Sequence, residues 1–130
     1  MRILLADDAA KVRFALRVLL ERRRGFKVVG EAIDTNELLV LSKAINPDLV
    51  LLDWELPGFG PTLTMLALRV HCPQTKVIAL SSNPEAEKDA AEAGVDAFIS
   101  KTAPPGYVLK VLYGLWNDTI PTAVSLAKEA

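Results

Sequence analysis

Short apolar runs alternate with helical patterns from one end of the chain to the other. Apolar residues that recur at helical spacing predict helices, and short, almost wholly apolar runs predict strands. Leu49–Leu52 is apolar throughout, as expected of a central strand covered on both faces. Lys27–Glu31 predicts an edge strand. The remaining strands are predicted at 3–6, 76–80 and 97–100. Helices are predicted at about 10–23, 84–93 and 105–116, with one more before Asn46-Pro47 and another that ends near His71-Cys72.

Residues that start or stop helices separate these segments. Gly25 and Gly94 follow the first and fourth predicted helices, and Asn46-Pro47 ends the second. Asp34 or Thr35 caps the second helix, and Pro61 opens the third. Five strand–helix units joined by short connections predict an α/β fold, with a parallel sheet and helices on both faces.

Size and composition indicate one soluble domain. The chain has 130 residues, of which 51% are hydrophobic and 24% charged, as in globular proteins. The strand–helix pattern defines one domain over 1–117, and we expect 118–130 to be a tail or the start of an interdomain linker. The net charge of −1 gives no electrostatic case for binding nucleic acid.

Several classes of protein are disfavoured by composition. A single cysteine excludes an internal disulfide, and with only one histidine the usual zinc ligand sets are missing. We therefore expect Cys72 and His71 to be structural. No apolar run reaches the ~20 residues needed to cross a membrane. The N-terminus, with two acids within its first eight residues, does not resemble a signal peptide. We therefore expect a cytoplasmic protein with no membrane association.

Acidic residues lie where the predicted strands end. Asp7 and Asp8 follow the first strand, Asp53 follows the third, and Lys101 follows the fifth. The carboxyl ends of parallel strands meet at one edge of the sheet, where open α/β sheets bind ligands. Carboxylates gathered there repel one another, and a hard divalent ion such as Mg²⁺ would offset that cost. The sequence therefore predicts an acidic metal site with a lysine beside it.

Four segments lie in order at predicted strand ends. They are Leu5-Ala6-Asp7-Asp8, Pro47 to Asp53 with Leu56-Pro57-Gly58 after it, Ala79-Leu80-Ser81-Ser82, and Ala97-Phe98-Ile99-Ser100-Lys101. Together they resemble the receiver domain of bacterial two-component response regulators. The resemblance covers about 2–116 and is closest to receivers that precede a helix-turn-helix domain in transcription regulators. It implies a flavodoxin-like three-layer sandwich with five helices and a five-stranded parallel sheet in the order 2-1-3-4-5.

The resemblance assigns a metal site and a phosphoacceptor. Asp53 would be the phosphoacceptor, because a carboxylate oxygen can attack a phosphoryl group and form an aspartyl phosphate. Asp8 would bind Mg²⁺ directly, with Asp7 assisting. Asp53 itself and the backbone carbonyl of Glu55 would complete the protein ligands. Mg²⁺ would neutralise charge on the phosphoryl oxygens.

Three further residues take roles from the same resemblance. Lys101 would pair with one phosphoryl oxygen, and Ser81 would donate a hydrogen bond to another. Phe98 stands where the family has an aromatic switch residue, although an aromatic side chain in a fifth strand is also a common core residue. Both interpretations of Phe98 stay open.

The chain departs from the family at two positions near this site. Many members have a proline after the lysine, in a cis bond, whereas Thr102 follows Lys101 here. Because a non-proline cis bond costs about 3 kcal/mol, we expect a trans bond. Glu55 adds negative charge near the phosphoryl group and bears on its lifetime. Trp54 adjoins Asp53 and is expected to be partly exposed, whereas Trp116 should pack the last helix.

The predicted function is a switch controlled by phosphorylation. A sensor histidine kinase or a phosphotransfer protein would supply the phosphoryl group. The face made by the fourth and fifth strand–helix units would then bias homodimer formation or partner docking. The output would be transcription regulation through a DNA-binding domain outside this chain. A stand-alone single-domain receiver, acting by protein–protein contact, is the alternative.

Two other functional classes fit the residues less well. An aspartate-nucleophile phosphatase of the dehalogenase type would need a second Asp two residues after the nucleophile, where Glu55 stands, and a nucleophile on the first strand. A flavodoxin-like cofactor binder would need a phosphate loop rich in hydroxyl groups and glycine after the first strand. Asp7-Asp8-Ala9-Ala10 is electrostatically the opposite of such a loop.

Overall fold

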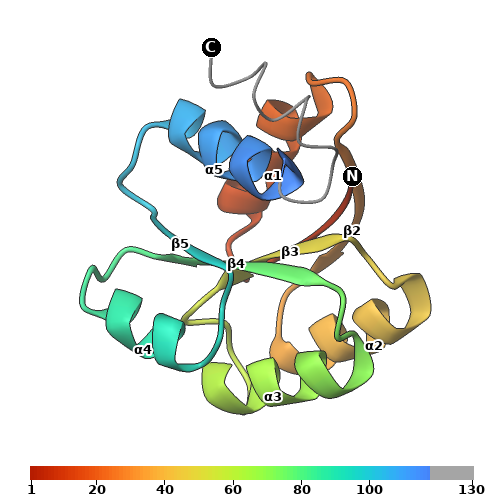
Figure 1. Ribbon diagram of the computed structural model, residues 1–130, viewed down its shortest axis with the longest axis vertical. Coiled ribbons are helices and arrows are strands. Elements are labelled where there is room, and N and C mark those ends of the chain that lie inside the picture. The colour runs from red at the N-terminus through yellow and green to blue at the C-terminus, as the bar shows by residue number, and fades with distance from the viewer. Residues whose placement is uncertain (118–130) are drawn as a thin grey trace.

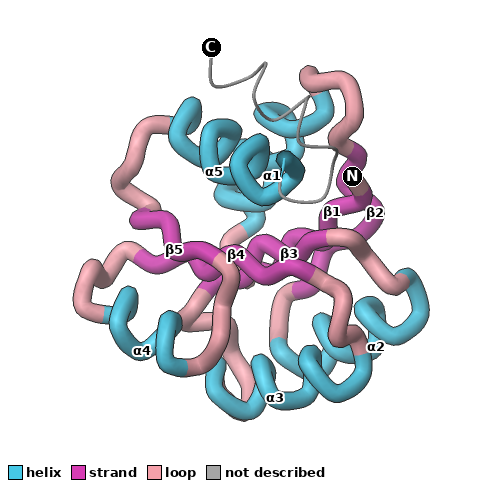
Figure 2. The backbone as a smooth tube through the Cα atoms, viewed as in Figure 1, coloured by secondary structure: helices cyan, strands magenta, loops and turns pink. Residues whose placement is uncertain are grey.

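A computed structural model describes residues 1–117 as a three-layer α/β sandwich. Its parallel sheet has five strands in the order β2-β1-β3-β4-β5. Helices α1 and α5 cover one face, and α2, α3 and α4 cover the other (Figures 1 and 2). The predicted fold class, strand order and layers are confirmed. The strands are β1 (Arg2–Ala6), β2 (Lys27–Ala32), β3 (Leu49–Asp53), β4 (Lys76–Ser81) and β5 (Ala97–Ser100), and the helices are α1 (Ala10–Glu21), α2 (Thr35–Ile45), α3 (Pro61–His71), α4 (Ala86–Glu92) and α5 (Pro105–Asn117).

The sheet separates two hydrophobic cores. Successive residues of a strand point to opposite faces, so Leu4 and Ala6 enter the core beneath α2, α3 and α4, while Ile3 and Leu5 enter the core beneath α1 and α5. All five residues of β3 are buried, as predicted for the central strand. β2 lies at the edge of the sheet, also as predicted. This burial fixes the register that brings the strand ends together.

The predicted helix ends are close to the observed ones. The Asp34 side chain caps α2 by accepting the Glu37 N–H at 2.8 Å, and Asn46 ends that helix in a left-handed conformation. α1 ends at Glu21, two residues earlier than Arg23. α4 begins at Ala86 and not at Pro84, because the residues before it form a turn in which Asn83 accepts the Glu85 N–H at 3.0 Å.

The last described helix is held by aromatic packing. The rings of Phe26 and Trp116 meet edge to face with centroids 6.4 Å apart, which confirms that Trp116 packs α5. Within residues 1–117, no helix is long and apolar enough to cross a membrane. The predicted tail or linker, 118–130, lies outside the described residues.

Candidate functional site

The ends of β1 and β3 bring two buried carboxylates together. Ala6 pairs with Leu52 in the sheet, so Asp7 and Asp53 follow at the same level of neighbouring strands. Their residues are only 1% and 2% exposed, whereas Asp8 is exposed. Each of the three residues offers a carboxylate oxygen within 4.8 Å of the others. The acidic cluster predicted from the sequence therefore exists, with one wall open to solvent.

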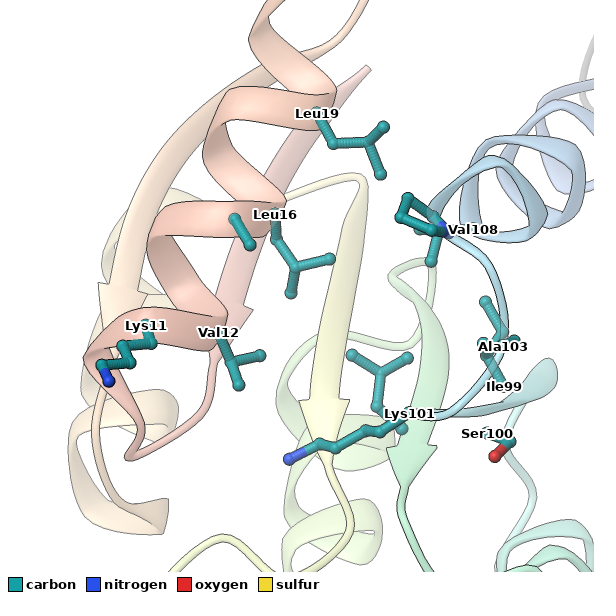
Figure 3. Close-up of a pocket in the computed structure, with 12 residues that line it drawn as sticks. Lys11, Val12, Leu16, Leu19, Ile99, Ser100, Lys101, Ala103 and Val108 are labelled. Atoms are coloured by element: carbon teal, nitrogen blue, oxygen red, sulfur yellow. The ribbon is translucent and has the colours of Figure 1, made fainter.

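Lys101 reaches this cluster from the end of β5. Its ammonium nitrogen lies 2.8 Å from Asp7 Oδ2 and 3.2 Å from Asp53 Oδ1. Figure 3 shows the side chain extending from the β5 end towards the tip of β3. The backbone N–H of Lys101 donates to the Ser81 carbonyl at 2.9 Å, which fixes the start of the loop. The peptide bond after Lys101 is trans, as expected, since the described residues contain no cis bond.

Burial and charge act in opposite directions on this cluster. Burial raises the pKa of Asp53 above its usual range; a hydrogen bond from the Glu55 N–H opposes this rise and the charge of Asp7 adds to it. Burial also lowers the pKa of Lys101, but its contacts with Asp7 and Asp53 outweigh that effect and leave the pKa raised. Lys101 therefore stays a cation at neutral pH. Three ionised carboxylates with one ammonium would leave the cluster negative.

The donor set suits a hard divalent cation. Asp7 Oδ1 accepts the Ala9 N–H at 2.9 Å, and Asp53 Oδ1 accepts the Glu55 N–H at 3.0 Å. Asp7 Oδ2 is buried, and no group among the described residues donates to it with hydrogen-bond geometry, although Lys101 lies beside it. Oxygen ligands and net negative charge are what Mg²⁺ prefers. The cluster could therefore hold a metal ion.

Ser81 has a hydrogen-bonding partner that the sequence did not predict. Its side chain is fully buried at the end of β4, and its Oγ donates to the Glu55 carboxylate, 2.9 Å from both Oε1 and Oε2. The same oxygen accepts the Asn83 N–H at 3.0 Å. Glu55 was expected to contribute only a backbone carbonyl and added negative charge. Because its exposed side chain can adopt many rotamers, no sequence pattern indicates this contact.

The prediction that Trp54 is partly exposed is wrong. The residue is 5% exposed, and its indole N–H donates to Asp89 of α4 at 3.0 Å. Its backbone N–H donates to the Leu80 carbonyl at 2.8 Å, so the chain continues alongside β4 after Asp53. Trp54 thus lies in the core on the α4 side and links the residue after Asp53 to that helix.

Cys72 is buried, whereas Phe98 is half-buried. Phe98 is partly buried against the core beneath α2, α3 and α4. Cys72 is buried, and its thiol lies 3.5 Å from the Ser42 carbonyl as a donor, which agrees with a structural role. Arg13 was not singled out from the sequence, yet its guanidinium donates to the Asp7 carbonyl at 2.8 Å and so holds the β1–α1 loop.

An apolar pocket of about 320 Å³ adjoins the cluster between α1 and α5. Figure 3 shows the aliphatic side chains of Val12, Leu16 and Leu19 facing Ile99 and Val108 across it. These side chains offer no donor or charge to a phosphoryl group. Lys11, Ser100 and Lys101 supply the polar part of the lining, while the carboxylates lie in the acidic cluster beside it.

A flavodoxin-like sheet with an acidic cluster and a lysine at the carboxyl ends of its strands defines a class of phosphate- and metal-handling α/β proteins. The family model for the response regulator receiver domain matches residues 3–113. The chain belongs to this family, and it is a response regulator receiver domain.

Relatives with known names agree with this assignment. The chain is 30% identical to the nitrate/nitrite response regulator protein NarL of Escherichia coli, over 85% of this chain and 52% of that protein. It is 35% identical to the transcriptional activator protein ExaE of Pseudomonas putida, over 98% of this chain and 62% of that protein. The chain thus spans between about half and three-fifths of these relatives.

A solved structure shows the same fold over nearly the whole chain. A two-component response regulator of the LuxR family from Aurantimonas superimposes with a TM-score of 0.84 at 28% identity, covering 98% of this chain and 93% of that one. A protein-glutamate methylesterase/protein-glutamine glutaminase of Geobacter sulfurreducens also matches, at 31% identity over 78% of this chain and 29% of that protein. Receivers related to this one therefore occur with more than one kind of output.

Proposed function

We propose that this receiver domain is a switch whose phosphoacceptor is Asp53. One observation carries the proposal: the buried Asp53 carboxylate lies 3.2 Å from the Lys101 ammonium and offers an oxygen within 4.8 Å of carboxylate oxygens of Asp7 and Asp8. An Asp53 oxygen would form a bond to phosphorus while the bond between phosphorus and its donor breaks, and the donor leaves with the electron pair. This chemistry transfers the phosphoryl group to the protein itself.

Each neighbouring residue has a distinct part in this transfer. Asp8 and Asp7, with Asp53 and the Glu55 carbonyl, would hold a Mg²⁺ ion. When bound, Mg²⁺ would neutralise negative charge on the phosphoryl oxygens. Lys101 already contacts Asp53 and would pair with a phosphoryl oxygen by a small movement.

Ser81 and Phe98 would convert the phosphorylation into a change of surface. Ser81 lies at the end of β4 with its hydroxyl buried, and Phe98 on β5 pairs with Ala79 of the neighbouring strand. If the hydroxyl turns to the phosphoryl group, the packing around the aromatic ring changes. This would alter the face formed by α4, β5 and α5. In this proposal the phosphodonor is a sensor histidine kinase or a phosphotransfer protein. The changed face would favour a homodimer.

The output is proposed to be transcription regulation. Similarity to a transcriptional activator and to a LuxR-family regulator supports a DNA-binding domain as the effector. The methylesterase relative leaves another output as the alternative, in which the receiver controls an enzymatic domain. A stand-alone receiver that acts by protein–protein contact is the third possibility.

Phosphorylation with a small donor tests the central proposal. Incubation with acetyl phosphate and Mg²⁺ should raise the intact mass by one phosphoryl unit. Asp53→Asn should abolish the rise, while Asp48→Asn, an exposed acid before β3, should leave it intact. Labelling of the Asp53→Asn variant to the wild-type extent would sink the assignment.

A further inference from the structure

The Glu55 carboxylate accepts the hydrogen bond from Ser81 that a phosphoryl group on Asp53 would need. Ser81 Oγ lies 2.9 Å from both Glu55 carboxylate oxygens and accepts the Asn83 N–H at 3.0 Å. A serine hydroxyl can donate one hydrogen bond, and here it donates that bond to the Glu55 carboxylate. We propose that Glu55 is a positioning residue that holds Ser81 in the unphosphorylated arrangement by competing with the phosphoryl group for this hydrogen bond. The inference rests on the proposed function of Asp53.

Glu55 is hydrogen-bonded to both Asp53 and Ser81. Its backbone N–H donates to Asp53 Oδ1 at 3.0 Å, and its side chain accepts from Ser81. The residue therefore links the phosphoacceptor at the end of β3 to the hydroxyl at the end of β4. A change at Asp53 is felt at Glu55 through the adjoining backbone. No other residue of the described chain is hydrogen-bonded to both of these side chains.

The two partners of the Ser81–Glu55 hydrogen bond differ in burial, so losing the bond costs Ser81 more than it costs Glu55. Ser81 is fully buried, so its hydroxyl needs a partner in every state of the protein. Glu55 is exposed, so water can replace Ser81 when the hydroxyl departs. Only an acceptor that reaches Ser81 inside the site can compete with Glu55. A phosphoryl oxygen on Asp53 is such an acceptor.

Charge adds to the competition. Phosphorylation replaces the single negative charge of the Asp53 carboxylate with roughly −2 on the aspartyl phosphate, close to the Glu55 carboxylate. The two anions repel each other, and each can accept the hydrogen bond from the Ser81 hydroxyl. Glu55 is therefore expelled as Ser81 is captured, and the switch has two arrangements that exclude one another. The energetic consequence is that Glu55 opposes activation and lowers the activated population at any given level of phosphodonor.

Binding of beryllofluoride with Mg²⁺ measures this opposition. Wild type, Glu55→Ala and Glu55→Gln are titrated while amide NMR signals are followed. We expect Glu55→Ala to tighten apparent beryllofluoride binding about threefold to tenfold, which is about 0.7–1.4 kcal/mol. Glu55→Gln keeps a neutral acceptor and should give a smaller gain. Glu92→Ala removes an exposed negative charge at the end of α4 and should leave the binding unchanged.

A double-mutant comparison with Ser81 distinguishes competition for the Ser81 hydrogen bond from simple charge repulsion between Glu55 and the bound anion. In a Ser81→Ala background, Glu55→Ala should lose most of its effect, because no proton remains to compete for. The Asn83 amide, which donates to Ser81, should shift in unliganded Glu55→Ala towards its position in the liganded wild type. An effect of the same size with and without Ser81 would overturn the inference, as would unchanged binding in Glu55→Ala. Failure of the wild type itself to bind beryllofluoride would instead refute the proposed function.

Discussion

The ammonium of Lys101 lies 2.8 Å from the buried carboxylate of Asp7, and this contact ties the loop after β5 to the loop after β1. The same nitrogen lies 3.2 Å from Asp53. Lys101 is thus the counter-charge of two buried acids before any phosphoryl group is present. The lysine proposed to pair with a phosphoryl oxygen therefore already balances buried negative charge in the unphosphorylated fold.

Replacing Lys101 should make stability depend on a divalent cation. Lys101→Met leaves Asp7 and Asp53 buried without their ammonium, and the free energy of unfolding in EDTA should fall by about 1–3 kcal/mol. Mg²⁺ should stabilise the variant more than it stabilises the wild type. Urea denaturation with EDTA and with Mg²⁺ measures both effects. Lys110→Met, an exposed lysine of α5, is the control. Equal stabilisation of both proteins by Mg²⁺ would contradict the role given to Lys101.

Asp8→Asn should weaken Mg²⁺ binding with little effect on the fold. Asp8 is exposed, so its replacement should change the free energy of unfolding by no more than about 0.5 kcal/mol. Mg²⁺ affinity should fall by about tenfold or more, since even outer partners of metal ligands contribute that much. The fluorescence of Trp54, with Trp116 replaced by Phe, follows the titration. Affinity equal to that of the wild type would refute Asp8 as a ligand.

The meeting of Asp7, Asp53 and Lys101 could be predicted because it depends only on where parallel strands end. Apolar runs fixed those ends to within a residue or two, and the register follows from burial of alternate residues. The contact between Glu55 and Ser81 could not be predicted, because it depends on one rotamer of an exposed side chain. Trp54 was misplaced for a related reason: adjacency to Asp53 does not determine which side of the chain the indole takes.

Acid should impair the site at a higher pH than an ordinary aspartate would require. Burial raises the pKa of Asp53, so at a given acidic pH a larger fraction is protonated than for an exposed aspartate. A protonated carboxyl neither binds Mg²⁺ nor attacks a phosphoryl group. Mg²⁺ affinity and labelling by acetyl phosphate should therefore begin to fall above the pH at which an aspartate with the ordinary pKa of about 3.9 would titrate.

Carbon-13 NMR of the Asp53 carboxyl checks this pH dependence directly. The midpoint measured without Mg²⁺ should lie above the ordinary aspartate value of about 3.9. Saturating Mg²⁺ should lower the Asp53 midpoint, since the cation favours the ionised form. A midpoint at or below about 3.9 would show that the Glu55 hydrogen bond and Lys101 outweigh burial.

The loop that carries Glu55 and Pro57 is anchored to α2 at a position where only glycine fits. Gly58 has φ +135, and a Cβ there would lie 1.8 Å from Thr35 Oγ1. Thr35 itself donates its N–H to the Pro57 carbonyl at 2.9 Å, and its hydroxyl oxygen accepts the Phe59 N–H at 3.1 Å. Gly58→Ala must therefore either displace Thr35 or move the loop.

Gly25→Ala is the matched control, because Gly25 also has a positive φ, +88, but has open space around its Cβ position. Both substitutions carry a backbone cost of about 1–3 kcal/mol at a positive φ, and the clash should cost Gly58→Ala about 1–3 kcal/mol more. Chemical denaturation gives the difference, and adding Thr35→Ala to Gly58→Ala should recover part of it. Because the same loop positions Glu55, Gly58→Ala should also shift the Ser81 and Asn83 amide signals, whereas Gly25→Ala should not. Equal destabilisation by the two substitutions would mean that the loop relaxes away from Thr35 at no cost.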